Sequence, residues 1–117
     1  MRIFASGLLV LSASLSSCQS YPETPSRVIS TRGEYSSISD CVYLAIEKQG
    51  AWRKEDLPSM KTSRLLRGDD KYAVGKVEFT QVNPETTKVS MWFSATVKGG
   101  NYYPDIIESA VKTCSLS

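Results

Sequence analysis

Few side chains in this sequence are of the types that catalyse reactions. The 117 residues contain no histidine, which excludes Ser-His-Asp and Cys-His catalysis and removes the commonest ligand of zinc and copper. Two pairs of neighbouring carboxylates remain, Glu55-Asp56 and Asp69-Asp70. A glycosidase needs two carboxylates that face each other across a cleft, and a calcium loop needs alternating acidic positions. Adjacent acids in expected turns meet neither requirement, so we expect no catalytic residue, no metal site and no cofactor.

Two short motifs carry little weight. Gly99-Gly100 lacks the spacing of a phosphate-binding or dinucleotide-binding loop. Arg67-Gly68-Asp69 spells the tripeptide that integrins read. This tripeptide lies in an expected turn, where glycine and aspartate are common for conformational reasons. Neither motif predicts a site.

The N-terminal segment has a pattern of a different kind. A basic residue and a short apolar run precede Leu15-Ser16-Ser17-Cys18. This order is typical of a secretory signal peptide, and the run is too short to span a bilayer. The position of Cys18 directly after small residues resembles the lipobox of bacterial lipoproteins. The resemblance implies cleavage before Cys18, lipidation of its thiol and acylation of the new amino group. The alternative is a secreted protein that is cut nearby and leaves Cys18 unmodified.

Lipidation would place the protein in the bacterial cell envelope. Several acyl chains hold a protein stably on a membrane. In enterobacteria-like species an aspartate after the lipidated cysteine marks retention in the inner membrane, so Gln19 favours the outer membrane, with the domain facing the periplasm. Removal of residues 1–17 leaves 100 residues, which suffice for one small domain. The net charge of +2 falls by one with the loss of Arg2, and so weak a balance does not favour a nucleic-acid partner.

The cysteine count agrees with the lipobox resemblance. Once Cys18 is lipidated, Cys41 and Cys114 remain as an even pair in a compartment where disulfides form. A bridge between them would enclose most of the mature chain and, on chain-entropy reasoning, stabilise the fold by about 4 kcal/mol. The alternative is two reduced cysteines that are buried as small apolar side chains.

The segment after Cys18 has the composition of a linker. Between residues 18 and 36 the chain is rich in polar residues and contains Pro22, Pro25 and Gly33. Such a composition predicts a flexible tether between the lipid and a domain that covers residues 37–117. Residues 27–31 could also pair as a short edge strand, but we adopt the tether interpretation.

Two amphipathic helices are expected to flank the domain. The first begins near Ser37, which forms a capping-box pattern with Asp40, and it ends at Gly50. Pro104 lies in the first turn of the second helix. Helical spacing predicts one apolar face on each: Ile38, Cys41, Val42 and Ala45 on the first, and Ile107, Ala110, Val111 and Cys114 on the second. Each of these cysteines thus falls on the apolar face of its helix.

Three strands are expected between the helices, over residues 62–67, 71–80 and 88–98. The last has the clearest alternation of apolar and polar residues. The pattern of the middle strand changes face at Gly75, which predicts a β-bulge there. Residues 51–58 are read as a polar connection. The expected fold is α+β, a two-layer sandwich in α-β-β-β-α order, with an antiparallel meander covered on one face by two disulfide-linked helices. We identify no specific family for this domain.

Four aromatic residues are candidates for contact with a partner. Trp92 lies on the polar side of the last strand, Trp52 in the polar connection, and Tyr102-Tyr103 after the double glycine. Large aromatics that face water often mark contact surfaces. The surface expected around Trp92 includes Lys88, Ser90, Ser94 and Thr96. The alternative is that the tether or residues 51–58 cover this face and bury Trp92.

These patterns predict a membrane-anchored, non-enzymatic envelope lipoprotein that binds an envelope protein as an accessory or assembly factor. The alternative is a periplasmic inhibitor or immunity protein that neutralises a toxin or hydrolase. An inhibitor usually fills a cleft with a protruding loop, so the tips at residues 68–70 or 99–103 would carry its key residues. The chain lacks the catalytic residue types discussed above, so we do not expect an enzyme. A lipid carrier would need more apolar residues than this chain has, in order to line a cavity.

Overall fold

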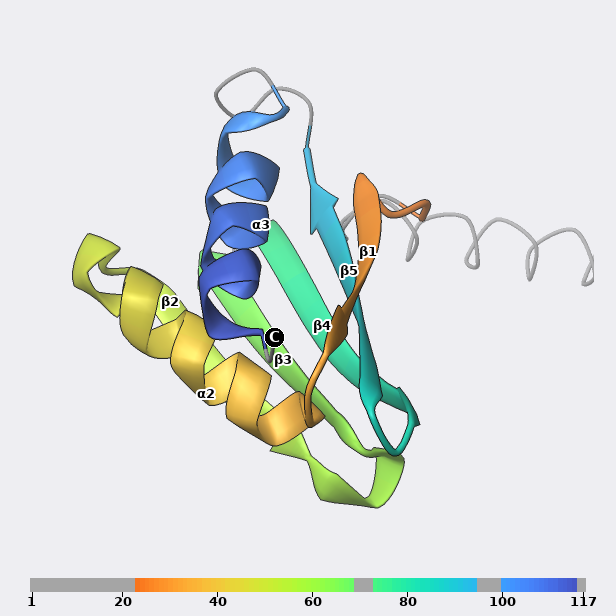
Figure 1. Ribbon diagram of the computed structural model, residues 1–117. Helices are drawn as coiled ribbons and strands as arrows, with labels where there is room; N and C mark the ends of the chain where they lie inside the picture. The colour runs from red at the N-terminus through yellow and green to blue at the C-terminus, as the bar shows by residue number, and fades with distance from the viewer. Residues whose placement is uncertain (1–22, 69–72, 95–99, 116–117) are drawn as a thin grey trace, which may run out of the picture.

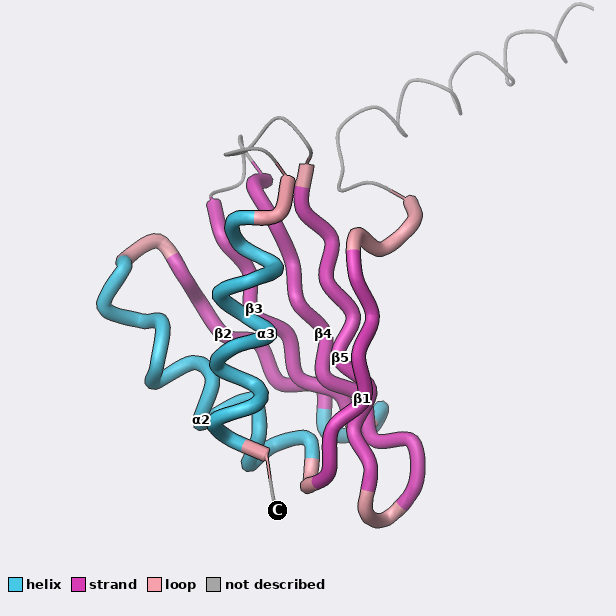
Figure 2. Tube along the Cα trace, turned by 45° about the horizontal axis from the view of Figure 1, so that its top comes forward, coloured by secondary structure: helices cyan, strands magenta, loops and turns pink. Residues whose placement is uncertain are grey.

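The computed structural model describes residues 23–68, 73–94 and 100–115. Its elements are β1 (Arg27–Arg32), α2 (Tyr35–Ile46), η2 (Glu47–Gln49), β2 (Trp52–Leu57), η3 (Pro58–Met60), β3 (Thr62–Gly68), β4 (Ala73–Asn83), β5 (Thr86–Phe93) and α3 (Tyr102–Cys114). The strands form one antiparallel sheet in the order β1-β5-β4-β3-β2, and both helices lie on the same side of it (Figures 1 and 2). The α+β class is confirmed. The expected order α-β-β-β-α is incomplete, because β1 and β2 extend the sheet at its two edges.

The three central strands follow the expected alternation. In β5, Val89, Met91 and Phe93 are 3% exposed or less, whereas Lys88 between them and the hairpin is exposed. Leu65 of β3 and Val77 and Phe79 of β4 lie on the same side of the sheet and pack in the core beneath the helices. The core comprises Ile38, Val42, Ile46, Trp52, Leu65, Val77, Phe79, Val89, Met91, Phe93, Tyr103, Ile107 and Val111. The register of β3 and β4 shifts where Arg67 opposes Gly75 and Gly68 opposes Ala73, so the irregularity adjoins Gly75 as predicted.

The tether interpretation is wrong for residues 27–32. These residues form β1, which pairs with β5 from Arg27 opposite Met91 to Arg32 opposite Thr86. Ile29 packs against the core from this strand. Val28 and Ile29 are β-branched and suit a strand. Two apolar residues among proline, glycine and polar neighbours are too few, however, to predict a strand from the sequence. The ordered domain therefore begins before residue 37.

The polar connection expected at residues 51–58 is also wrong. Residues 52–57 form β2, which pairs with β3 from Trp52 opposite Arg67 to Leu57 opposite Thr62. This strand has charged residues at four consecutive positions, so it shows no apolar alternation. Its charges instead alternate between two faces of the sheet and find ionic partners on both.

Both expected helices are present, but the first residue of α2 and its buried face differ from the prediction. α2 begins at Tyr35 because the carboxylate of Glu34, and not Ser37, forms the N-cap, accepting the Ser37 backbone N–H at 3.2 Å. Its buried side chains are Ile38, Ser39, Val42 and Ile46, so the expected face members Cys41 and Ala45 lie toward solvent. Gly50 follows η2 with φ +72° and ψ 170°, a positive-φ conformation that is almost restricted to glycine.

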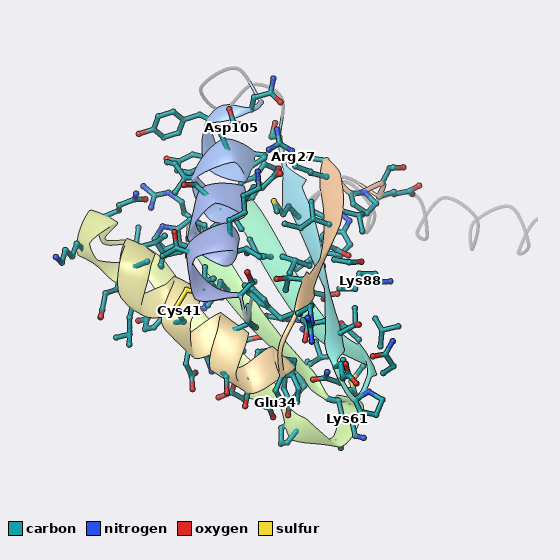
Figure 3. All side chains as sticks on the ribbon, viewed as in Figure 1. Arg27, Glu34, Cys41, Lys61, Lys88 and Asp105 are labelled. Atoms are coloured by element: carbon teal, nitrogen blue, oxygen red, sulfur yellow. A yellow bond between two sulfur atoms is a disulfide. The ribbon has the colours of Figure 1, made fainter. Side chains whose placement is uncertain are left out.

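A disulfide joins the two helices. The Cα atoms of Cys41 and Cys114 lie 5.9 Å apart, and 73 positions separate them in the sequence. The bridge is visible as a yellow bond beside the Cys41 label in Figure 3. Cys114 packs against the core, while Cys41 is exposed. The predicted pairing is confirmed, although the apolar position predicted for Cys41 is wrong. Separately, no described helix has the length and apolar character needed to cross a bilayer.

Candidate protein-binding face

The side of the sheet that faces away from both helices carries Trp92. We call it the outer face. Antiparallel register places directly opposed residues on one side of a sheet, which assigns this face its members: Val28, Ser30, Arg32, Arg53, Glu55, Leu57, Thr62, Arg64, Leu66, Lys76, Glu78, Thr80, Thr86, Lys88, Ser90 and Trp92. Trp92 is partly exposed, and β2 lies beside β3 in the sheet instead of covering it. The arrangement in which residues 51–58 bury Trp92 is therefore absent. Figure 3 shows Lys88 on the far side of the sheet from the helices.

Trp92 ends a row of side chains that crosses four strands. Lys76 opposes Trp92 directly, and its Nζ lies 4.4 Å from the centroid of the indole ring. A cation over a tryptophan face at this distance contributes about 0.5–1 kcal/mol where solvent has access. Leu66 continues the row and is only 6% exposed although it lies on the outer face. Trp92 is thus held against the sheet, with its orientation fixed by Lys76.

A second row consists of alternating charges. Arg64 donates from Nε to Glu78 at 2.9 Å and lies 3.8 Å from Glu55. Lys76 lies 3.8 Å from the same Glu78 oxygen, which joins the two rows. Glu78 and Lys76 side chains are each 21% exposed. Ion pairs so shielded keep a defined geometry, so the centre of the outer face presents fixed charges of both signs.

The exposure of this face varies toward its margins. Thr62, whose hydroxyl lies 3.2 Å from that of Thr80 on the neighbouring strand, is only 4% exposed. Val28 on the edge strand β1 is 52% exposed, and Lys88 beside it is exposed. Ser90, expected in this surface, is on the outer face but only 6% exposed. Thr96 lies outside the described residues. The outer face therefore combines an aromatic, fixed ion pairs and an exposed β-branched edge.

Trp52 and Tyr103 do not belong to any exposed surface, contrary to expectation. Trp52 is 7% exposed and Tyr103 is 6% exposed. Their rings pack edge-to-face at 6.3 Å, and Tyr103 stacks on Phe93 at 5.5 Å. Arg67 lies over both, with its guanidinium carbon 5.5 Å and 4.9 Å from the ring centroids. Trp52 faces the helices because it belongs to strand β2. The sequence gives no sign of this burial, because residues 51–58 have the composition of a polar connection.

Tyr102 is separated from the other candidates. It begins α3, is 46% exposed and meets the Tyr103 ring edge-to-face at 4.9 Å. Of the four aromatic candidates, the structure thus leaves Trp92 on the outer face and Tyr102 at the end of a helix. The other two are core residues.

The carboxylate pair on β2 cannot work as a catalytic dyad. Glu55 lies on the outer face near Arg64, whereas Asp56 lies on the opposite face of the sheet, where it accepts hydrogen bonds from Lys54 and from Ser63 at 2.6 Å. Those bonds, with Lys54 first, lower the pKa of Asp56 below its usual value. Asp69-Asp70 lie outside the described residues. Within residues 23–68, 73–94 and 100–115, no three metal-ligating side chains gather.

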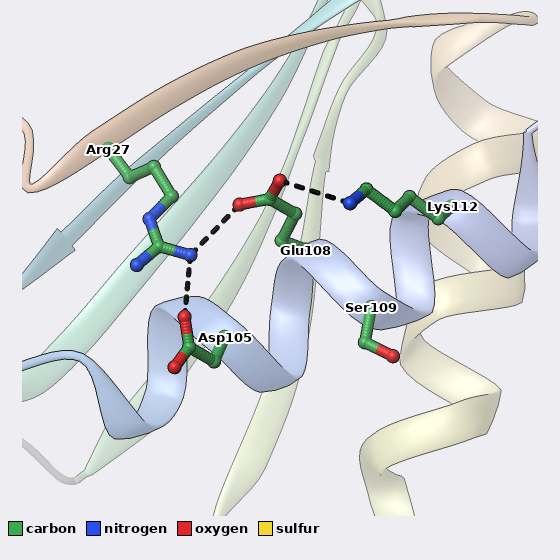
Figure 4. A pocket seen from close by; sticks show the side chains of 5 residues that line it. All are labelled: Arg27, Asp105, Glu108, Ser109 and Lys112. Carbon is green, nitrogen blue, oxygen red and sulfur yellow. Dashed lines mark hydrogen bonds and ion pairs between the residues drawn. The ribbon is translucent and has the colours of Figure 1, made fainter.

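Two cations at the sheet edges were not predicted as interaction sites. Arg27 on β1 donates to Glu108 at 2.9 Å and pairs with Asp105 at 2.9 Å, above a hollow of about 290 Å³ that Ser109 and Lys112 complete (Figure 4). The hydrogen bond to Asp105, followed by that to Glu108, raises the pKa of Arg27. Each charged side chain drawn in that hollow has an ionic partner, and the remaining polar group is the Ser109 hydroxyl. The hollow is therefore a place where ion pairs attach β1 to α3.

Lys54 on β2 is the second such cation. It pairs with Asp40 of α2 at 2.9 Å and with Asp56, and its side chain is 17% exposed. Burial lowers the pKa of Lys54, but hydrogen bonds to Asp56 and Asp40 outweigh this effect, and the pKa lies above its ordinary value. In the sequence, the only indication of this contact is that Lys54 and Asp56 are two positions apart, which would place both on the same face of a strand.

No protein-family model matches this sequence, and no curated protein matches it.

Proposed function

We propose that this protein is a non-enzymatic lipoprotein of the bacterial cell envelope that binds another envelope protein through the outer face. Cys18 would carry the lipid, and the domain would face the periplasm from the outer membrane. The lipobox-like Leu15-Ser16-Ser17-Cys18 segment supports the anchor. The Cys41–Cys114 bridge supports an oxidising compartment. In this proposal the domain works as two layers, with the helices on one side and the binding sheet on the other.

The observation that carries the proposal is the partly exposed Trp92 beside fixed ion pairs. Tryptophan and arginine are the residues most enriched where binding energy concentrates in protein interfaces, and the outer face has both in ordered positions. Five strands make the face about 20 Å wide, and β5 gives it a length of about 26 Å. An area of that size and flatness suits one side of a small protein interface. It does not suit a small molecule, which needs a concave pocket.

The first test concerns the anchor. Intact-mass analysis of the protein purified from its native host should give a species that begins at Cys18 and carries a diacylglyceryl group and an amide-linked acyl chain. A species that retains residues 1–17, or that begins elsewhere with a free Cys18 thiol, contradicts the anchored-lipoprotein proposal.

The second test concerns the outer face. Crosslinking in intact cells, followed by mass spectrometry, should identify an envelope protein whose yield falls at least tenfold in Trp92→Ala. Leu44→Ala is the matched control, because Leu44 is 63% exposed on α2, away from this face, and its yield should be unchanged. Equal loss in both variants, or none in either, counts against the face. Loss only on substitution in the 99–103 tip would favour the inhibitor alternative.

A further inference from the structure

The point at which the chain joins the domain is fixed. Ser26 precedes β1, and its backbone N–H donates to the Met91 carbonyl at 2.6 Å. The Ser26 hydroxyl donates to the Phe93 carbonyl at 3.0 Å and accepts the Phe93 N–H at 2.9 Å. These bonds attach Ser26 to the last residues of β5. The domain therefore begins at Ser26, eleven residues earlier than the tether interpretation implied.

The covalent length before that point is short. Seven residues, 19–25, separate Cys18 from Ser26, and we call them the linker. Eight steps between consecutive Cα atoms span at most about 28 Å even when fully extended. Whatever is bound at Cys18 is therefore within about 28 Å of the end of the sheet that carries Ser26.

One end of α3 lies at this same end of the sheet. Arg27 follows Ser26 and donates to Asn101 at 3.4 Å, and it pairs with Asp105 in the first turn of α3. Figure 3 shows Arg27 and Asp105 together, at the opposite end of the domain from Lys61. Tyr102 lies between Asn101 and this turn and is 46% exposed. We call this region the proximal end. Tyrosine, with an apolar ring and a polar hydroxyl, is enriched where proteins meet the lipid head groups.

The opposite end of the sheet holds the β4–β5 hairpin and η3. Gly33 donates to Glu85 there at 2.9 Å, and Lys61 donates to Pro58. From Phe93 to this distal end, the eight residues of β5 cover about 26 Å. A distal end that rested on the bilayer would place Ser26 about 26 Å above it. The linker could then reach only when almost fully extended, which is entropically the least favourable arrangement.

We propose that the proximal end of the domain rests on the bilayer that holds the anchor, and that Tyr102 contacts the lipid head groups there. This inference rests on the proposed lipidation of Cys18. Arg27 and Lys112 pair with Asp105 and Glu108, whereas the guanidinium of Arg67 lies over Tyr103 and donates to the Gly50 carbonyl. A single additional cation adds little attraction to a membrane surface at moderate salt, so the contact depends chiefly on the short linker and the aromatic ring and should largely persist at high salt.

The test uses the full lipidated protein in vesicles of phosphatidylethanolamine and phosphatidylglycerol. A photoreactive benzoylphenylalanine replaces Tyr102 in one sample and Met60 in another, since Met60 is 61% exposed at the distal end. Illumination should attach lipid to position 102 at least fivefold more than to position 60, at low and at high salt. Insertion of eight Gly/Ser residues between Glu23 and Thr24 should bring the ratio close to one.

Equal labelling at the two positions, or greater labelling at position 60, overturns the inference. A ratio that the longer linker leaves unchanged also overturns it, because the linker would then not set the orientation. Vesicle flotation and intact mass report the anchor independently. Floating, lipidated protein without preferential labelling thus rejects the orientation and keeps the proposed anchor, whereas protein without lipid at Cys18 rejects both.

Discussion

The two edges of the sheet are attached to the helices by the same kind of contact, built in different ways. At one edge, Arg27 of β1 reaches two carboxylates of α3, each at 2.9 Å. At the other edge, Lys54 of β2 divides its contacts between Asp40 of α2 and Asp56 of its own strand. Both cations point toward the helix side of the sheet. Inward-pointing charges also discourage edge strands from pairing with other chains.

The partners of these cations differ in burial. Of the two partners of Arg27, Asp105 is 68% exposed but Glu108 only 27%, whereas both partners of Lys54, Asp40 and Asp56, are well exposed, at 62% and 57%. An unpaired carboxylate that water reaches easily costs little, and one that is shielded costs more. The β1 edge should therefore depend more strongly on its cation than the β2 edge does. At each sheet edge, ion pairs to the helices add to the apolar packing of Ile29 or Trp52, whereas the central strands lie under the helices with mainly apolar packing on that side.

The largest expected effect comes from removing the Cys41–Cys114 disulfide, which links α2 to α3. Cys41→Ser with Cys114→Ser should lower the free energy of unfolding by about 4 kcal/mol, since the bridge closes a long loop in the unfolded chain. Urea unfolding followed by tryptophan fluorescence measures the change. The two single variants serve as controls and should lose about as much. A loss below about 1 kcal/mol would contradict the expectation that the bridge stabilises the fold by restricting the unfolded chain.

A substitution in a central strand should come next. An added Cβ at Gly75 would lie 2.0 Å from two ring atoms of Phe93, which is itself 3% exposed and stacked on Tyr103. Gly75→Ala should therefore cost about 3 kcal/mol by overpacking. Gly50→Ala, with no atom within 4 Å of the added Cβ, is the spatial control, and its smaller cost reflects only its positive φ. Equal costs would mean that crowding by Phe93 is unimportant.

The matched pair Arg27→Met and Lys54→Met tests the comparison of the two edges directly. Arg27→Met should cost about 1 kcal/mol, because Glu108 would keep only the exposed Lys112, at 3.5 Å, as an ionic partner. Lys54→Met should cost less than about 1 kcal/mol, because Asp40 and Asp56 are mostly hydrated. Urea midpoints and hydrogen exchange of β1 and β2 amides report each edge. A greater loss for Lys54→Met would reverse the ranking.

The smallest effect concerns pH. The folded protein lowers the pKa of Asp56, chiefly through Lys54, so this group adds stability above its unfolded pKa of about 3.9 and loses it as the pH falls through the folded value. Asp56→Asn should therefore flatten the decline in stability between pH 5 and pH 2 by well under 1 kcal/mol, given its exposure. Glu34, whose pKa is also lowered by Ser36 and Ser37, should keep part of the decline. An unchanged slope would show that Asp56 is not coupled to folding.

The same contrast explains how much of the fold the sequence reveals. Apolar alternation identifies β5 and, with a change of face at Gly75, β4, while β3 is marked mainly by the turn composition after it. Helical spacing identifies α2 and α3, because these elements bury apolar side chains in one core. β1 and β2 are not recognised from the sequence, because Arg27 and Lys54 occupy positions that face the helices, where a strand pattern requires apolar residues. Ion pairs between distant segments leave no local period. The disulfide could be anticipated only through the cysteine count.

The candidate site shows a similar division. The polar side of β5 correctly indicated that Trp92 lies on the outer face, since a well-patterned strand fixes which side each residue takes. Trp52 and Tyr103 were misassigned because their burial depends on β2 and on Arg67, which lies over both rings. The pairing of Arg64 with Glu78 also depends on register between strands. Such contacts become visible only when the strands are placed.

The disulfide also determines how the domain responds to mechanical load. Tension on the proposed anchor enters at Ser26, and β1 is the first element it can pull from the sheet. Extraction must stop at Cys41, because everything from that residue to Cys114 lies inside a covalently closed ring. Only residues 27–40 can be drawn out, about 50 Å of extended chain. The bridge thus acts as a mechanical stop that keeps β2 to β5 intact while the segment next to the anchor yields.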